Sequence, residues 1–235
     1  MISKNSATKR FNSTEAQVAK LLKMQDELNT YIHPEWKTQG FDWYEAIVDE
    51  CCELKGHLGW KWWKKDYKVG LTDNNRKQVQ LEVIDILHFM LSGLIENQYT
   101  PEEIVTIFNG SMVPTNYTLA NAVDRMRFMA CDGYYAAVQW AWAAQLTDLT
   151  EQEILETYTQ KYVLNKFRQD HGYKDGSYVK EWLLPISEHN GAPEFKEDNE
   201  VLSHVVNQFT LGGRDTTDEQ LLYNTLKFYY NYRLN

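Results

Sequence analysis

The sequence predicts an all-α protein, folded as a single-domain helical bundle, and three observations lead to that prediction. Apolar residues recur at intervals of three and four along most of the chain, which is the period of an amphipathic helix. No segment shows the sustained alternation of apolar and polar residues that is typical of a half-buried strand. Polar capping residues stand at the starts of several periodic segments.

Four helices are predicted in the first half of the chain. The first follows a polar cap and ends before Pro34, because the residue before a proline avoids helical backbone angles. The second closes near Gly59. The fourth is short and begins at Thr100 and Pro101, since proline is favoured at the first helical position. The first three are expected over 13–32, 41–58 and 75–98.

Five further helices and one long loop are predicted in the second half. Thr150 with Glu153 forms a capping box, and Thr216 with Glu219 is expected to open the last helix in the same way. Glycine, proline and charged residues are frequent in 171–197, so this segment is expected to be an extended functional loop. The five helices are expected over 115–131, 134–147, 150–169, 198–211 and 216–233.

The composition is typical of a globular protein. Of 235 residues, 43% are hydrophobic and 14% aromatic, which suffices for one domain over 1–235, and residues 1–13 are expected to be flexible. Neither a signal peptide nor an apolar run of membrane-spanning length is evident, so a cytoplasmic protein without a membrane partner is expected. The formal net charge of −9 argues against a nucleic-acid partner, because such proteins carry a basic surface.

Cysteine usage gives no indication of a redox or zinc site. The chain has three cysteines and no CxxC pair, and two of the three, Cys51 and Cys52, are adjacent. Adjacent helical residues point about 100° apart, so at most one of these two can face a given site. Both are expected to pack as small hydrophobic side chains.

Two acidic pairs with a spacing of three lie on consecutive predicted helices. Glu50 and Glu53 border the apolar stripe of one helix, and Glu82 and Asp85 border that of the next. If the two helices are antiparallel neighbours, the four carboxylates converge, and like charges about 5 Å apart repel by roughly 3 kcal/mol per pair. Such a cluster needs cations, and oxygen ligands favour Mg²⁺ or Mn²⁺. A solvated acidic face is the alternative.

Two neighbouring features have two interpretations each. Asp85 and His88 are spaced as in di-iron bundles, but those sites need Glu-x-x-His on two helices and the chain contains none. His88 is therefore expected to be a hydrogen-bonded histidine or to lie behind a metal ligand. The segment GWKWWK (59–64) fits either an aromatic platform with phosphate-binding lysines or core anchors whose lysines reach solvent.

A basic segment at 161–182 carries side chains that bind phosphate. In so acidic a chain, a local excess of positive charge suggests one half of a site for a metal-bound nucleotide, with the carboxylates as the other half. An ordinary basic loop is the alternative. The groups concerned are Lys161, Lys166, Arg168, Tyr173, Lys174, Tyr178 and Lys180.

Taken together, these segments resemble dimeric dUTPases of the all-α NTP pyrophosphatase superfamily. The superfamily motif is ExxE, a spacer and ExxD. It is matched here by Glu50 to Glu53, a long spacer over 54–81, and Glu82 to Asp85. Further segments resemble the dimeric dUTPases in the same order along about 20–205, and 183–196 is an insertion relative to the family. These segments are MQDELN (24–29), GWKWWK (59–64), DILHF (85–89), LNKFRQDHGYKDGSY (164–178) and EDN (197–199).

The resemblance implies a homodimer that hydrolyses dUTP with Mg²⁺ or substitute Mn²⁺, and it leaves open whether dUDP is also a substrate. The four acids would coordinate the metal, with Glu50 orienting or deprotonating the attacking water. Phe89 would stack on uracil, and the basic loop would order over the phosphates. The substrate-binding residues would be Gln25, Asn29, Lys61, Trp62, Phe89, Asn165, Arg168, Tyr173, Lys180 and Asn199.

Three other functions remain open at this stage. A superfamily relative could act on dCTP or on several nucleoside triphosphates. A helical scaffold or regulator-binding protein could retain the acidic cluster without activity. A di-iron oxidoreductase would contain bound iron.

Overall fold

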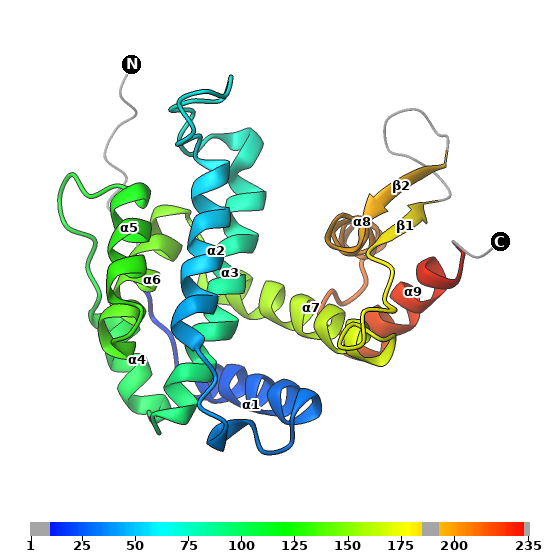
Figure 1. Cartoon of the computed structure of the whole chain (residues 1–235), viewed down its shortest axis with the longest axis horizontal. Coiled ribbons are helices and arrows are strands. Elements are labelled where there is room, and N and C mark those ends of the chain that lie inside the picture. The colour runs from blue at the N-terminus through cyan, green and yellow to red at the C-terminus, as the bar shows by residue number, and fades with distance from the viewer. Residues whose placement is uncertain (1–9, 185–192, 233–235) are drawn as a thin grey trace. The chain divides into compact units, whose positions relative to one another are not determined.

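The computed structural model describes residues 10–184 and 193–232, and the chain divides into two compact units (Figure 1). The first unit ends at Leu155, and the second begins at Glu156. The prediction of one domain over 1–235 therefore stays a prediction.

Nine α-helices, a short 3₁₀ helix and two short strands make up the described part of the chain, which confirms the all-α prediction. In the first unit they are α1 (Glu15–Ile32), η1 (Trp36–Thr38), α2 (Trp43–His57), α3 (Asp73–Glu96), α4 (Pro101–Gly110), α5 (Leu119–Met129), α6 (Gly133–Leu146) and the start of α7 (Glu151–Asp170). The second unit contains the rest of α7, β1 (Glu181–Leu184), β2 (Glu194–Glu197), α8 (Asp198–Leu211) and α9 (Glu219–Tyr232).

Helix starts follow the capping residues closely. Capping boxes begin α1 at Thr14 and α4 at Thr100, and Thr150 and Glu153 exchange the same pair of bonds ahead of α7. The predicted start of the last helix is wrong. Asp218, and not Thr216, caps α9, because its Oδ1 accepts a bond of 2.9 Å from the N–H of Leu221.

The core of the first unit is built around α3, which packs against α1, α2 and α6 (Figure 1). Among the described residues, α3 is the one helix long and apolar enough to cross a membrane, but 61% of its most apolar window is buried inside the protein. A buried core helix meets the same criteria. The apolar stripe that Glu82 and Asp85 border is buried throughout: Val79, Val83, Ile86, Met90 and Leu94.

The segment before α1 is fixed at Phe11, so the prediction that all of 1–13 is flexible is wrong for this part of the segment. The Phe11 ring is buried and lies 6.3 Å from the Trp140 ring, centroid to centroid. Backbone groups of Ser13 exchange two hydrogen bonds with the Asn109 side chain, of 2.8 and 2.9 Å. Residues 1–9 lie outside the described part.

The cysteine prediction is half right. Cys51 is fully buried, as expected of a small core residue, and burial raises the pKa of its thiol to about 12. Cys52 is exposed, because its position on α2 points away from the stripe that faces the core.

The second unit corrects the prediction of an extended loop over 171–197. Its last part is an antiparallel hairpin in which β1 pairs with β2, from Glu181 opposite Glu197 to Leu184 opposite Glu194. Trp182 and Leu184 alternate inward, and Trp182 packs 5.4 Å from the ring of Phe167 on α7. Part of the insertion 183–196 lies outside the described residues.

Candidate functional site

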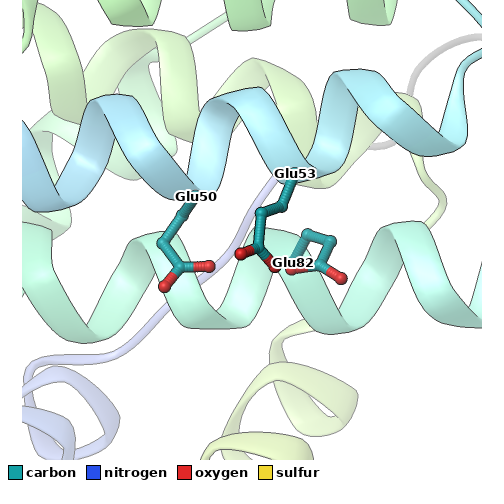
Figure 2. A group of neighbouring side chains, drawn as sticks. All are labelled: Glu50, Glu53 and Glu82. Atoms are coloured by element: carbon teal, nitrogen blue, oxygen red, sulfur yellow. The ribbon is translucent and has the colours of Figure 1, made fainter.

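Three of the four predicted metal ligands converge between α2 and α3. The helices run antiparallel: Asn75 at the start of α3 bonds the carbonyl of His57 at the end of α2 (2.9 Å), and Trp43 bonds Glu96 at the opposite ends (3.1 Å). This arrangement turns the Glu50–Glu53 edge of α2 toward Glu82 on α3 (Figure 2). Each of the three offers a carboxylate oxygen, and the three oxygens lie within 4.8 Å of one another.

Asp85, the fourth predicted ligand, is outside this group of three. It lies one helical turn after Glu82 and is half-buried. Its negative charge nevertheless acts on Glu82 and raises the pKa of that carboxyl.

Glu82 is the buried member of the cluster. Burial raises the pKa of Glu82 above its ordinary value, because the charged form loses its hydration. The hydrogen bond from Gln78 opposes that shift, the charge of Asp85 adds to it, and the contact with His57 lowers the pKa again. A buried carboxylate with other carboxylates beside it is favourable only with a compensating cation, so this all-oxygen donor set fits Mg²⁺ or Mn²⁺.

Gln25 and Asn29, predicted to recognise the base, are buried on α1 and belong to one polar network with α3. The Gln25 amide donates to Asn29 Oδ1 (2.9 Å), and its Oε1 is 2.8 Å from His88 Nδ1. Asn29 and Gln25 both donate to Ser92 Oγ, at 2.9 and 3.0 Å. The structure thus confirms a hydrogen-bonded His88.

Ser92 was missed by the sequence analysis. Ser92 lies four residues after His88 and therefore on the same face of α3. This spacing was the feature of the sequence that could have identified it. Phe89, predicted to stack on the base, is half-buried on the same helix, seven residues after Glu82.

The tryptophan segment forms an exposed aromatic loop and does not supply core anchors. Trp62 is 73% exposed, and its ring meets that of Trp63 edge to face at 5.7 Å, while Trp63 meets Trp60 at 5.6 Å. The Lys61 ammonium lies 5.8 Å from the Trp60 ring centroid. These side chains fit the platform interpretation, and Trp60 also lines a cleft of about 480 Å³ beside the start of α5.

The base of this loop depends on Gly59. The Gly59 carbonyl accepts a 2.7 Å bond from the N–H of Lys68, which closes the loop. Gly59 has φ +72°, and a Cβ there would lie 1.9 Å from the carbonyl oxygen of Asp66. No other residue type fits this position without moving the loop.

In the second unit, Arg168 makes a buried ion pair that the sequence analysis did not predict. Its Nε and Nη2 each donate a 2.8 Å bond to Asp198 at the start of α8, and Nη1 donates to Asn165 Oδ1 (3.0 Å). Tyr178 adds a 2.7 Å bond to the same carboxylate. Burial alone would raise the pKa of Asp198, but the bonds from Arg168 and Tyr178 outweigh it and hold that pKa below its ordinary value.

The other predicted phosphate-side residues surround this pair. Tyr173 is exposed, with its ring 5.7 Å from the Arg168 guanidinium. Asn199 follows Asp198 on α8 and accepts a 3.0 Å bond from Lys161. Lys180 is half-exposed, and its ammonium is 3.8 Å from a Glu197 carboxylate oxygen.

Comparison with known proteins identifies one family. A family model described as dUTPase matches residues 17–173, which is more than half of the chain. The matched span includes the α1 network, all four acids, the tryptophan loop and α7, and it ends before Lys180 and Asn199. No curated protein matches the chain.

Proposed function

Because the chain belongs to the dUTPase family, whose members hydrolyse dUTP to dUMP and pyrophosphate, we propose that Glu50, Glu53 and Glu82 hold Mg²⁺ for this reaction. The single observation that supports the proposal is the convergence of these three carboxylates within the matched span. Asp85, one turn beyond Glu82, is proposed as the fourth ligand.

The three carboxylates would have different roles in the reaction, according to how buried each one is. When bound, Mg²⁺ would neutralise negative charge on the phosphate oxygens and orient an in-line water. Glu50 is half-buried at the edge of the cluster, and we propose that it accepts a hydrogen bond or a proton from that water. Glu82 is buried and Glu53 exposed, so Glu82 would act as a fixed ligand and Glu53 as an accessible one.

We propose that the α1 network and Phe89 select the base. Gln25 and Asn29 have amide groups that can both donate and accept, which suits the edge of uracil with one N–H between two carbonyls. To bind uracil, these amides would exchange some of their bonds to each other and to Ser92 for bonds to the base. A base with a different edge would not replace the bonds given up, and this costs enough to discriminate strongly. Phe89 would stack on the ring, and Trp62 with Lys61 would form a wall of the pocket.

We propose that the second unit binds the phosphates and the nucleoside. Arginine has five N–H donors, and the described bonds of Arg168 to Asp198 and Asn165 use three of them. The other two could donate to phosphate oxygens. Tyr173, Lys180 and Asn199 would complete the phosphate contacts, and Asn165 would contact the nucleoside. The segment around them would order on the nucleotide.

The quaternary structure, the location and the choice of metal are further parts of the proposal. We propose a cytoplasmic homodimer that also accepts Mn²⁺ and dUDP. The YYAAVQWAWAAQL segment is largely core, since Trp140 is fully buried, but Tyr134, Tyr135 and Phe128 are exposed and would be covered by a partner.

A nucleotide panel with and without Mg²⁺ tests the proposal. We expect Mg²⁺-dependent release of pyrophosphate from dUTP, in preference to dCTP and dTTP. Glu53→Gln should lower the rate roughly 100-fold or more, since bound metal supplies several kcal/mol of transition-state stabilisation. Asp49→Asn, an exposed acid of the same helix, is the matched control and should keep the wild-type rate.

The same panel, together with metal analysis of the purified protein, separates the other functions. Dominant hydrolysis of dCTP would contradict the assignment of the base. Absence of any Mg²⁺-dependent turnover would favour a scaffold or regulator-binding protein, and stoichiometric bound iron would indicate an oxidoreductase.

A further inference from the structure

We propose that His57 and Gln78 are positioning residues that make Glu82 bind its cation through a single oxygen, Oε2. This inference deepens the proposed function and rests on it. Neither residue belongs to the ExxE or ExxD motif.

Both contacts meet the same carboxylate oxygen. Gln78 Nε2 donates to Glu82 Oε1 at 2.8 Å, and His57 Nε2 lies 3.1 Å from that same Oε1. A carboxylate oxygen accepts through two lone pairs, so two donors occupy Oε1 and orient the group. Oε2 is then the oxygen directed to the cation, and one oxygen per carboxylate suits the octahedral geometry of Mg²⁺.

The contact also assigns a role to the imidazole. An ionised carboxylate only accepts hydrogen bonds, so His57 must carry its hydrogen on Nε2 when it bonds Glu82. That nitrogen cannot be a metal ligand at the same time. Through this nitrogen, His57 therefore acts on the metal by way of Glu82.

The backbone that carries the His57 donor is fixed, and the Gln78 donor comes from the same helix as Glu82. His57 ends α2, and its carbonyl accepts a 2.9 Å bond from the Asn75 amide, which also bonds the carbonyl of Gly70 at 2.8 Å. Gln78 lies one turn before Glu82 on α3, so it reaches the same carboxylate from within the helix. Residues from both helices therefore fix the buried ligand.

Manganese binding to the full-length protein without nucleotide tests the inference. The probe is Mn²⁺ alone, measured by the EPR signal of the free ion. We expect His57→Ala and Gln78→Ala each to raise the Kd about tenfold or more, the usual effect of losing a partner of a metal ligand. His57→Gln should recover most of the affinity, because its amide can donate to Oε1 from a similar position.

Two control variants account for general structural effects. Gln80→Ala removes a glutamine of the same helix that bonds the Thr147 carbonyl (2.8 Å), and His204→Ala removes a histidine of the second unit. Both should bind Mn²⁺ as the wild type does. At saturating Mg²⁺, His57→Ala should keep most of its kcat while the Mg²⁺ concentration for half-maximal rate rises.

The outcomes are distinguishable. If Glu82→Gln loses Mn²⁺ binding but His57→Ala and Gln78→Ala bind it with the wild-type Kd, the inference is overturned and the metal site stands. Equal weakening by the control variants also overturns it. If Glu82→Gln binds as tightly as the wild type, the proposed metal site fails and the inference fails with it.

Discussion

The buried pair of Arg168 and Asp198 makes a sharp prediction about the stability of the second unit. Asp198 is fully buried, and three donors from Arg168 and Tyr178 converge on it at 2.7 to 2.8 Å. Asp198→Ala would leave the Arg168 guanidinium, whose side chain is 12% exposed, buried without its counter-charge. Loss of one partner of such a pair costs about 3–5 kcal/mol.

Hydrogen exchange read by mass spectrometry is the suitable assay, because it localises the loss to α8 and β2. A cost of that size should speed exchange through local opening by roughly two to four powers of ten. Lys196→Ala is the control: its ion pairs with Glu194 and Glu200 lie on the surface of the same region and should matter little. Combining Asp198→Leu with Arg168→Met should cost less than the two changes added, since no buried charge is left unpaired.

The pH dependence of this unit follows from the lowered pKa of Asp198. A carboxyl with a lowered pKa adds stability above its ordinary pKa of 3.8, and this is lost as the pH falls through the folded value. Protection in α8 should thus decline at acidic pH in the wild type and change less in Asp198→Asn. Unchanged exchange in Asp198→Ala at neutral pH would refute the reasoning.

Three further predictions follow from single sites. Without metal, Glu82→Gln should unfold at a higher urea concentration than the wild type at pH 7, because the raised pKa of Glu82 makes its charged form costly in the folded state. This difference in stability should shrink as the pH falls toward 4.5, the ordinary pKa of a glutamate. A wild type of equal or greater stability at pH 7 would contradict the prediction. Gly59→Ala should disorder the tryptophan loop and make it sensitive to protease. Gly56→Ala is the control and should leave the loop intact, because a Cβ at that position meets nothing within 4 Å. Equal protease sensitivity of the two variants would contradict the role of Gly59 in closing the loop. Asp218→Ala should destabilise α9 by about 1 kcal/mol, and Thr216→Ala, as control, should not, with α9 exchange as the measurement.

Helices and the acidic cluster were predictable from the sequence because both depend on local spacing. Caps such as Thr100 and Thr150 determine helix starts from within four residues. Convergence of Glu50 and Glu53 with Glu82 needs one further step, an antiparallel pairing of α2 with α3, which the bonds of Asn75 to His57 and of Trp43 to Glu96 hold at its two ends. The spacing of three then brings the acids to the facing edges.

Other features depend on contacts between distant residues, for which the sequence has no local pattern. Each strand of the hairpin is four residues long, too short for alternation to be recognised, and the pairing joins Glu181 to Glu197 across the insertion. Arg168 reaches Asp198 across 30 positions, and His57 reaches Glu82 across 25. The sequence indicated the basic segment that contains Arg168 and the helix end at His57, but it did not indicate that these residues bond Asp198 and Glu82.

Phe11 has a practical consequence for expressing the protein. It belongs to no helix, yet its ring covers Phe108 and Trp140 in the core of the first unit. A truncation that starts at α1 would expose those rings to water and invite aggregation. Affinity tags and cleavage sites therefore belong upstream of residue 10, with Phe11 retained in the shortest fragment.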